Sequence, residues 1–532
     1  MTTSKKTIST ARGVRNISLQ STINALTGTG LFIFMARMIT PEEMGLFSAL
    51  TLTLSIGVMV GVLGLDYAAT RYISYLEGKR KQSMIRATGK RILIISLISS
   101  GITTSAFFIF APTISQLLFR TDSYTPLLQI TALTIFPTIS QFVVLGFLQG
   151  FQSFSMIAIT RILAQITRLT ATVALLLAGF GVLGAILGWA MFAVVFVIMA
   201  LPLIVKNFIR KDEANTTELH PTKLGGSLGY RELFAFSLPM MGVYMLNYIV
   251  NSMDQYVVLG ITGLESLGGY FVATTASSVI ITILGTPLIM TLTPSFSEVH
   301  GKKNIDAVAK SLTHASRYIG LFFTPATFLL AALSPIALHI LGGTSYLNAS
   351  TSLTIMSLGL STYGISVLMI STLTAIAKTR TILIVLALAS ITELVASITL
   401  TPLYGLTGAA TSRVIMYIVM LIAFLYLGKR HIPILLDKKA FLNSLAASTV
   451  MALATYILAS LTGFTIWFLP IYLLVALTTY TLCLSALKGI TVSDVNLIMN
   501  MIPKGPTVYV NIKRRIKKSR KLYSIATRLI SN

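Results

Sequence analysis

The sequence is poor in charged residues, and this scarcity excludes an ordinary soluble domain. Only 11% of its 532 residues are charged, while 54% are hydrophobic; a soluble domain carries about 25% charged residues. Acidic residues are the scarcest, with 16 Asp and Glu against 41 Lys and Arg. Long apolar runs recur throughout, most of them near the ~20 residues that cross a ~30 Å hydrocarbon core. The composition therefore predicts an all-α integral membrane protein that crosses the bilayer many times.

Residues that carry catalysis or bind metals are also scarce. The single cysteine, Cys483, lies in an apolar run and excludes a disulfide within the chain. The five histidines are scattered without metal-ligand spacing, and no G-x-x-x-x-G-K-[ST] loop for hydrolysing ATP occurs. The sequence also lacks a pair of carboxylates at a predicted membrane surface, which a glycosyl-transfer enzyme would need. We therefore expect neither an enzyme nor a metal or cofactor site.

The apolar runs predict about fourteen transmembrane helices. Pro, Gly or charged residues separate them, and their even number places both chain termini on one side of the membrane. The predicted spans are 17–38, 44–69, 91–114, 127–148, 155–179, 182–205, 233–259, 268–292, 316–341, 351–376, 381–401, 404–427, 440–463 and 465–487.

Positive charge gathers in alternate loops. If the N-terminus is cytoplasmic, all but five of the Lys and Arg residues fall in cytoplasmic segments, as the positive-inside rule requires. The net charge of +25 is then explained without nucleic acid as a partner. We expect a multi-pass protein of the cell (plasma) membrane with both termini cytoplasmic. The basic tail is predicted to lie on anionic lipid head groups or to dock a partner protein.

Three short motifs recur at a nearly constant offset of 223 or 224 residues. They predict two parallel six-helix repeats related by an axis along the membrane normal, facing each other across a central cavity. The matching motifs are Glu42-x-x-Gly45 with Glu265-x-x-Gly268, Gly78-Lys79-Arg80 with Gly301-Lys302-Lys303, and Gly181-x-x-Gly184-Ala185 with Gly405-x-x-Gly408-Ala409. The predicted divisions are an N-terminal lobe (1–205), a cytoplasmic linker (206–232), a C-terminal lobe (233–428), two additional helices (429–488) and the basic tail (489–532).

Ionisable residues inside apolar runs are candidates for function because burying them in a membrane is costly. Arg161, Gln165 and Arg168 are spaced i, i+4 and i+7, so they share one helix face. Two arginines in this arrangement suit a phosphate or diphosphate. The alternative is that each pairs with a structural carboxylate or caps a neighbouring helix.

A second polar face occurs in the seventh predicted span. Tyr244, Asn247, Asn251 and Asp254 recur at helical spacing on an otherwise apolar helix. They either line the cavity and bind substrate or hold two helices together. Asp254 lies towards the predicted outer end, where we expect water to reach it.

Two further acidic residues have basic residues at a similar predicted depth. Glu393 and Arg413 flank the turn near residue 402 at nearly equal distances along a helical hairpin. They form either a structural salt bridge or a site for a coupling ion. Asp66 lies near the inner end of its span, close in depth to Arg12 and Arg15, and a structural pair is expected there.

Several motifs resemble those of polysaccharide-biosynthesis flippases (the Wzx type). This family belongs to the multidrug/oligosaccharidyl-lipid/polysaccharide (MOP) exporter superfamily, which is MATE-like in fold. The matches span both predicted lobes. They are Met38-Ile39-Thr40-Pro41-Glu42-Glu43-Met44-Gly45-Leu46-Phe47, Gly64-Leu65-Asp66-Tyr67 with Arg71-Tyr72-Ile73, Asp254-Gln255-Tyr256-Val257-Val258-Leu259-Gly260 with Gly268-Gly269-Tyr270, Pro294-Ser295-Phe296-Ser297-Glu298, and Pro402-Leu403-Tyr404-Gly405-Leu406-Thr407-Gly408-Ala409-Ala410.

The resemblance implies a V-shaped transporter that moves a lipid-linked oligosaccharide to the outer leaflet by alternating access. Its partners would be membrane lipids, the lipid-linked glycan and glycan-assembly enzymes. A cation-coupled multidrug or metabolite antiporter of the same superfamily, with Asp254 or Glu393 as the coupling residue, is an alternative. A membrane scaffold for glycan-assembly enzymes is another.

Overall fold

The structure is a computed structural model that describes residues 27–79, 82–209, 229–285, 292–293, 296–297, 305–434 and 436–489. Within these ranges every regular element is helical, which confirms the predicted fold class. Eleven helices are long and apolar enough to cross a membrane, and a bent pair, Val308–Ala332 with Ser334–Gly342, raises the number to 12 if it forms one span. The count of fourteen stays a prediction, because the first predicted span begins outside the described residues. The basic tail and most of the predicted linker also lie outside them.

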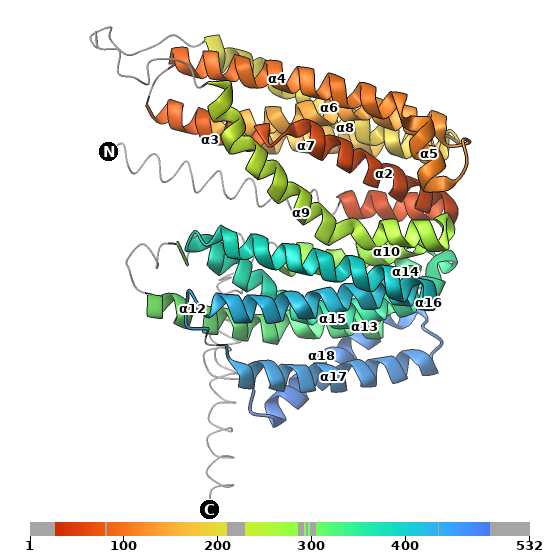
Figure 1. Ribbon diagram of the computed structural model, residues 1–532. Helices are drawn as coiled ribbons and strands as arrows, with labels where there is room; N and C mark the ends of the chain where they lie inside the picture. The colour runs from red at the N-terminus through yellow and green to blue at the C-terminus, as the bar shows by residue number, and fades with distance from the viewer. Residues whose placement is uncertain are drawn as a thin grey trace, which may run out of the picture.

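The first bundle begins at a helical segment, 27–38, and ends with α8 (Figure 1). Thr40 starts α2 with a capping box: its hydroxyl accepts from the Glu43 N–H at 3.2 Å, and its N–H donates to Glu43 Oε2 at 2.8 Å. The helices are α2 (Pro41–Val62), α3 (Leu65–Gly78), α4 (Gln82–Ile109), α5 (Ala111–Phe119), α6 (Thr125–Gly150), α7 (Phe154–Leu177) and α8 (Gly181–Ile209).

The second bundle runs from α9 to α16. The longest element, α16, contains the two predicted spans 381–401 and 404–427. They are separate helical arms, because Gly405, near their junction, has non-helical angles (φ 56°, ψ −133°). The elements are α9 (Tyr230–Thr262), α10 (Leu264–Ile280), η1 (Ile281–Gly285), α12 (Ile305–Tyr318), η2 (Ile319–Phe323), α13 (Thr324–Ala332), α14 (Ser334–Gly342), η3 (Thr344–Ala349), α15 (Ser350–Ala375) and α16 (Thr379–Gly428).

The last two helices, α17 (Lys438–Leu461) and α18 (Leu469–Ala486), follow the second bundle and flank the short η4 (Ile466–Phe468). They dock at the π-helical segment η2. The Tyr480 hydroxyl donates to the carbonyl of Leu321 at 2.9 Å, and the Ser444 hydroxyl donates to the carbonyl of Gly320. A π-helix displaces backbone carbonyls from the regular ladder, so these two side chains supply partners there.

The predicted second span, 44–69, is not one continuous helix. It breaks where Leu63 and Gly64 adopt left-handed angles (φ 53° and 70°) between α2 and α3. A Cβ on Gly64 would collide with the backbone of Ser237 in α9. Glycine is therefore required both by the backbone conformation and by the close approach of α9.

The two bundles touch at the end where α2 and α10 begin, which we call the outer end in keeping with the predicted orientation. A Cβ on Gly45 would collide with the Leu264 carbonyl, and a Cβ on Gly268 would collide with the Pro41 carbonyl. The repeated glycines thus form a reciprocal crossing of α2 and α10. Figure 1 shows the bundles close together here and further apart at the end where α3 and α12 lie.

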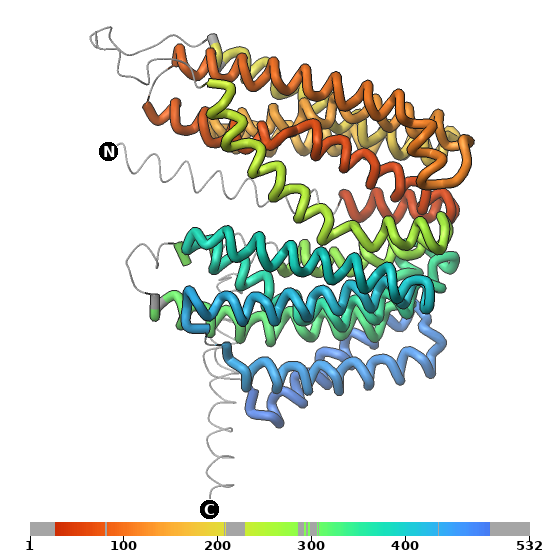
Figure 2. The backbone as a smooth tube through the Cα atoms, viewed as in Figure 1, coloured from red at the N-terminus to blue at the C-terminus, as the bar shows by residue number. Residues whose placement is uncertain are grey.

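Helix α9 runs diagonally from one bundle to the other, as the tube in Figure 2 shows. Near its start, Leu233 is fully buried in the core of the first bundle with Leu65 and Ile73. Near its end, Val258 is buried against Tyr270 of the second bundle. The helix therefore contributes to both bundles.

Candidate functional site

A cavity of about 360 Å³ lies between the first bundle and α9. Its walls come from α2, α6, α7 and α8 on one side and from α9 on the other. Arg168 is the one charged side chain among the described residues that line it. The remaining lining is largely apolar. Its polar members are Ser55, Thr138, Gln141, Tyr244 and Tyr248.

The guanidinium of Arg168 is held by an aromatic ring and keeps unused hydrogen-bonding capacity. Its central carbon lies 4.5 Å from the centroid of the Trp189 ring on α8, within the range of a cation–π contact. Its Nε is buried and has no hydrogen-bond partner among the described residues. Leaving a buried donor unpaired is costly. An anionic ligand in the cavity would satisfy both the charge and the donor.

Arg161 and Gln165 lie on the same helix as Arg168 but in different surroundings. Gln165 is buried in the bundle, whereas Arg161 is half-buried. Neither lines the cavity. Within the described ranges we find no ion pair between Arg161 and a carboxylate. The structure therefore brings Arg168 to the cavity, and a role for Arg161 and Gln165 in binding stays a prediction.

The polar face predicted on α9 is divided between different environments. Tyr244 lines the cavity. Asn247 and Asn251 are exposed, and their Nδ2 atoms donate to the carbonyls of Val243 and Asn247 at 2.9 and 2.6 Å. The two asparagines lie outside the lining of the cavity, so their proposed contact with substrate stays a prediction.

Asp66 is bonded to α9 across the bundle interface. Its Oδ2 accepts from the Tyr244 hydroxyl at 2.6 Å, and its Oδ1 is buried without a partner among the described residues. The partners expected from the sequence, Arg12 and Arg15, lie outside the described residues. The Tyr244 contact was missed because depth along a helix does not reveal which helix of the other bundle lies opposite.

A second cluster of buried charges lies in the other bundle. Arg413 donates from Nη2 to Asp254 Oδ1 at 2.6 Å and from Nε to Asp254 Oδ2 at 2.7 Å. The Nε atom also lies 3.7 Å from Glu393 Oε1. Glu393 and Arg413 therefore lie close together, as expected, but Asp254 is the closer partner of Arg413. The expectation that water reaches Asp254 is wrong, because its side chain is 0% exposed.

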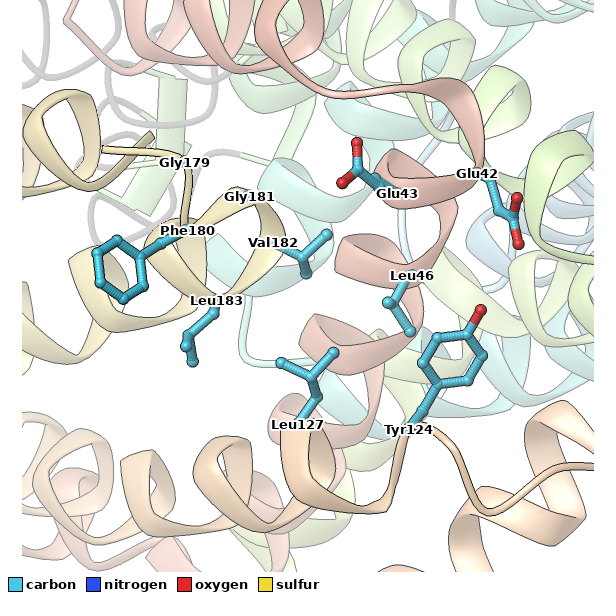
Figure 3. Close-up of a pocket in the computed structure, with 10 residues that line it drawn as sticks. All are labelled: Glu42, Glu43, Leu46, Tyr124, Leu127, Gly179, Phe180, Gly181, Val182 and Leu183. Atoms are coloured by element: carbon cyan, nitrogen blue, oxygen red, sulfur yellow. The ribbon is translucent and has the colours of Figure 1, made fainter. Parts of the chain in front are cut away.

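A different cavity, of about 400 Å³, opens at the outer end of the first bundle (Figure 3). The turn around Gly181 forms one side, and Glu42, Glu43 and Tyr124 form the other. The hydroxyl of Tyr124 points towards Glu42. Because the carboxylate of Glu43 is already bonded to Thr40 as a helix cap, this cavity has few free polar groups with which to bind a ligand.

Comparison with known proteins assigns the chain to a family. Residues 10–300 match the family described as polysaccharide biosynthesis protein. An uncharacterized membrane protein of Methanocaldococcus jannaschii is 24% identical over 401 residues, which cover 73% of this chain and 78% of that protein. The sporulation protein YkvU of Bacillus subtilis is 24% identical over 298 residues, which cover 53% of this chain and 63% of that protein.

Solved structures of two kinds of transporter share the fold. The lipid II flippase MurJ, in an inward closed conformation, superimposes with a TM-score of 0.65 at 18% identity over 88% of this chain and 98% of its own. An inward-facing multidrug MATE transporter of the MOP superfamily superimposes with a TM-score of 0.63 at 16% identity, over 79% of this chain and 98% of its own. The predicted MATE-like architecture is thereby confirmed.

Proposed function

This chain belongs to the polysaccharide biosynthesis protein family, and we propose that it is a flippase for lipid-linked oligosaccharide or polysaccharide precursors. The two bundles would alternate in opening to the two sides of a plasma membrane, with both chain termini cytoplasmic. Sugar and phosphate would cross through the cavity while the lipid tail stays in the bilayer. The shared fold of the lipid II flippase MurJ supports a lipid-linked cargo.

The observation that carries this proposal is the charge of Arg168 in the cavity between the bundles, which no carboxylate among the described residues neutralises. Its Nε has no partner among the described residues, and the ring of Trp189 holds the guanidinium in place. A phosphate or diphosphate linkage is the anion that a lipid-linked sugar presents, and a guanidinium binds it through forked donors. Arg161 would approach the same anion when the bundles rearrange.

The membrane potential suffices to drive an anionic cargo outwards. Moving one negative charge outwards gains about 2.3 kcal/mol per 100 mV of inside-negative potential. A flippase of this kind therefore needs no ATP-hydrolysing loop, in keeping with its absence from the sequence.

The cation-coupled antiporter is the second candidate. The buried carboxylates of Asp254 and Glu393 favour it, because transporters use such groups to carry coupling ions. A cationic drug, however, would be repelled by Arg168 in the cavity. The scaffold alternative rested on the basic tail, which lies outside the described residues.

The test is reconstitution into vesicles with a labelled lipid-linked oligosaccharide. We expect Arg168→Ala to weaken binding of this substrate by about tenfold or more, because a charge-assisted hydrogen bond contributes roughly 1.5–3 kcal/mol. Arg168→Lys should recover part of the loss, since it restores the charge without the forked donors.

The matched control is Arg380→Ala, which removes an exposed cation at the start of α16 and should leave binding unchanged. If Arg168→Ala translocates like the wild type, the anion site is wrong. If the wild type moves cationic drugs and no glycan, the proposed function is wrong.

A further inference from the structure

Asp254 is fully satisfied as an ionised carboxylate. Its Oδ1 accepts from Arg413 Nη2 and from the Gln255 N–H, at 2.6 and 2.9 Å. Its Oδ2 accepts from Arg413 Nε at 2.7 Å and from the Tyr270 hydroxyl. These four donors occupy both oxygens of the carboxylate, and two of them come from one guanidinium. Asp254 and Arg413 therefore form a neutral pair.

Glu393 has the opposite environment. Its side chain is 0% exposed, and neither Oε1 nor Oε2 has a hydrogen-bond partner among the described residues. The nearest cation, Arg413, is at 3.7 Å and already makes two short bonds to Asp254. An ionised Glu393 would leave one uncompensated negative charge in the core, which costs far more than a neutral carboxylic acid.

The charged and titratable groups of the cluster around Glu393 and Arg413 lie on four helices. Helix α9 supplies Asp254, α10 supplies Tyr270, α15 supplies Tyr363, and α16 itself supplies Arg413 and Tyr417. Arg413 is the one cation in this group. Within the described residues no set of three or more His, Cys, Asp or Glu side chains is arranged to hold a metal ion.

We propose that Glu393 is a proton-binding site of the second bundle, occupied in the conformation described and exchanged during the transport cycle. The ligand is a proton and not a sodium ion, because the guanidinium of Arg413 already fills the space between the two carboxylates. This goes beyond the proposed function, since the site is separate from the cavity that contains Arg168.

The geometry also links this proton to the contact between the bundles. On loss of the proton, Glu393 competes with Asp254 for Arg413. The residue that follows Asp254 on α9 is Gln255, whose Oε1 accepts from Ser48 of α2 at 3.2 Å. A shift of Asp254 therefore acts directly on a hydrogen bond between α9 and the first bundle. Protonation of Glu393 favours the arrangement in which this bond is present.

The first experiment is infrared spectroscopy of the purified full-length chain without substrate. We expect a carbonyl stretch from a protonated carboxylic acid that is lost in Glu393→Gln, a variant that mimics the neutral side chain. The control is Glu265→Gln, an exposed glutamate in the first turn of α10, which should leave the band unchanged. A band that persists in Glu393→Gln would overturn the proposal.

The second experiment uses the wild-type chain and so does not depend on how a variant folds. Dicyclohexylcarbodiimide reacts with protonated buried carboxyls, and peptide mass spectrometry locates the adduct. We expect labelling of Glu393 and not of Asp254, falling roughly tenfold for each pH unit above the transition, as for a single-proton site. Sodium ions should give no protection.

Protection by sodium, or no adduct on Glu393 from mildly acidic to mildly alkaline pH, would overturn the proton assignment. Both measurements are made without cargo. A failure of glycan translocation would therefore be separable from a failure of the proton site.

Discussion

Arg413 lies between the buried side chains of Asp254 and Glu393, and its removal would leave the charge of Asp254 without a cation. A buried charge without its partner costs about 3–5 kcal/mol. We therefore expect Arg413→Met to lower the free energy of unfolding by about that amount. The measurement is thermal unfolding of the purified chain in detergent.

The control for this prediction also removes the charge of Asp254 and replaces Glu393 by its neutral amide. In the triple variant Arg413→Met/Asp254→Asn/Glu393→Gln no unpaired charge remains, so most of the lost stability should return. Wild-type stability in Arg413→Met alone would contradict the role assigned to this cluster.

The sequence predicted one contact of Arg413 and missed the stronger one. Glu393 was identifiable because both residues flank a single hairpin, and helical rise fixes their depth. Asp254 lies on α9, far away in the sequence, and its contact depends on how α9 is rotated against α16. Hydropathy and spacing contain no information on that rotation. The same limit explains why Trp189 was not recognised as the partner of Arg168.

Helices α17 and α18 are attached to the second bundle through two hydroxyls that contact the π-helix η2. Tyr480 donates to Leu321 O and lies 2.9 Å from the Ser444 hydroxyl. Removing one partner of a buried hydrogen bond costs about 1–3 kcal/mol. We expect Tyr480→Phe and Ser444→Ala each to speed hydrogen exchange in α17 and α18 about 5–150-fold, the factor that 1–3 kcal/mol gives.

A suitable control is Thr481→Ala. Thr481 is exposed, and its hydroxyl bonds only to carbonyls of its own helix, those of Leu477 and Thr478. Its replacement should change stability by less than about 0.5 kcal/mol. Equal exchange rates in Tyr480→Phe and Thr481→Ala would argue against docking through η2.

Hydropathy located most of the spanning helices but not their interruptions. The runs 127–148 and 155–179 correspond closely to α6 and α7. The break at Gly64 and the π-helix η2 leave mean hydropathy almost unchanged, because both alter backbone hydrogen bonding and not polarity. Only the close approach of another helix, such as α9 at Gly64, explains where these breaks occur.

Across the whole molecule, the crossing of Gly45 and Gly268 sets how closely the bundles approach at the outer end. A Cβ at Gly45 would collide with the backbone of Leu264, which a side-chain rotation cannot relieve. We expect Gly45→Ala to shift the population towards conformations that separate the outer ends, by about 5–30-fold for a cost of about 1–2 kcal/mol.

The shift can be measured by thiol labelling. In a Cys483→Ser background, Ala273→Cys places a thiol at a position that is 0% exposed, in the core cluster shared by both bundles. A membrane-impermeant maleimide should react faster when Gly45→Ala is added. Gly101→Ala is the control, because no atom lies within 4 Å of its added Cβ. Equal labelling in both variants would contradict the crossing as the point of contact.

The internal repeat extends to the positions of the charged residues. Each bundle contains a hairpin in which a glycine packs on a backbone peptide of the preceding arm: Gly184 on the Leu175–Leu176 peptide, and Gly408 on the Leu400–Thr401 peptide. Counting seven residues back from Leu175 and from Leu400 gives Arg168 and Glu393. Counting five residues on from Gly184 and from Gly408 gives Trp189 and Arg413.

Arg168 with Trp189, and Glu393 with Arg413, therefore occupy equivalent positions in the two hairpins but differ in charge. Among the described residues, the first hairpin presents a cation without a carboxylate partner, suited to the proposed cargo. The other presents an unpaired carboxyl group, suited to the proton that would accompany it. The two halves of this chain thus place different chemistry on equivalent hairpins.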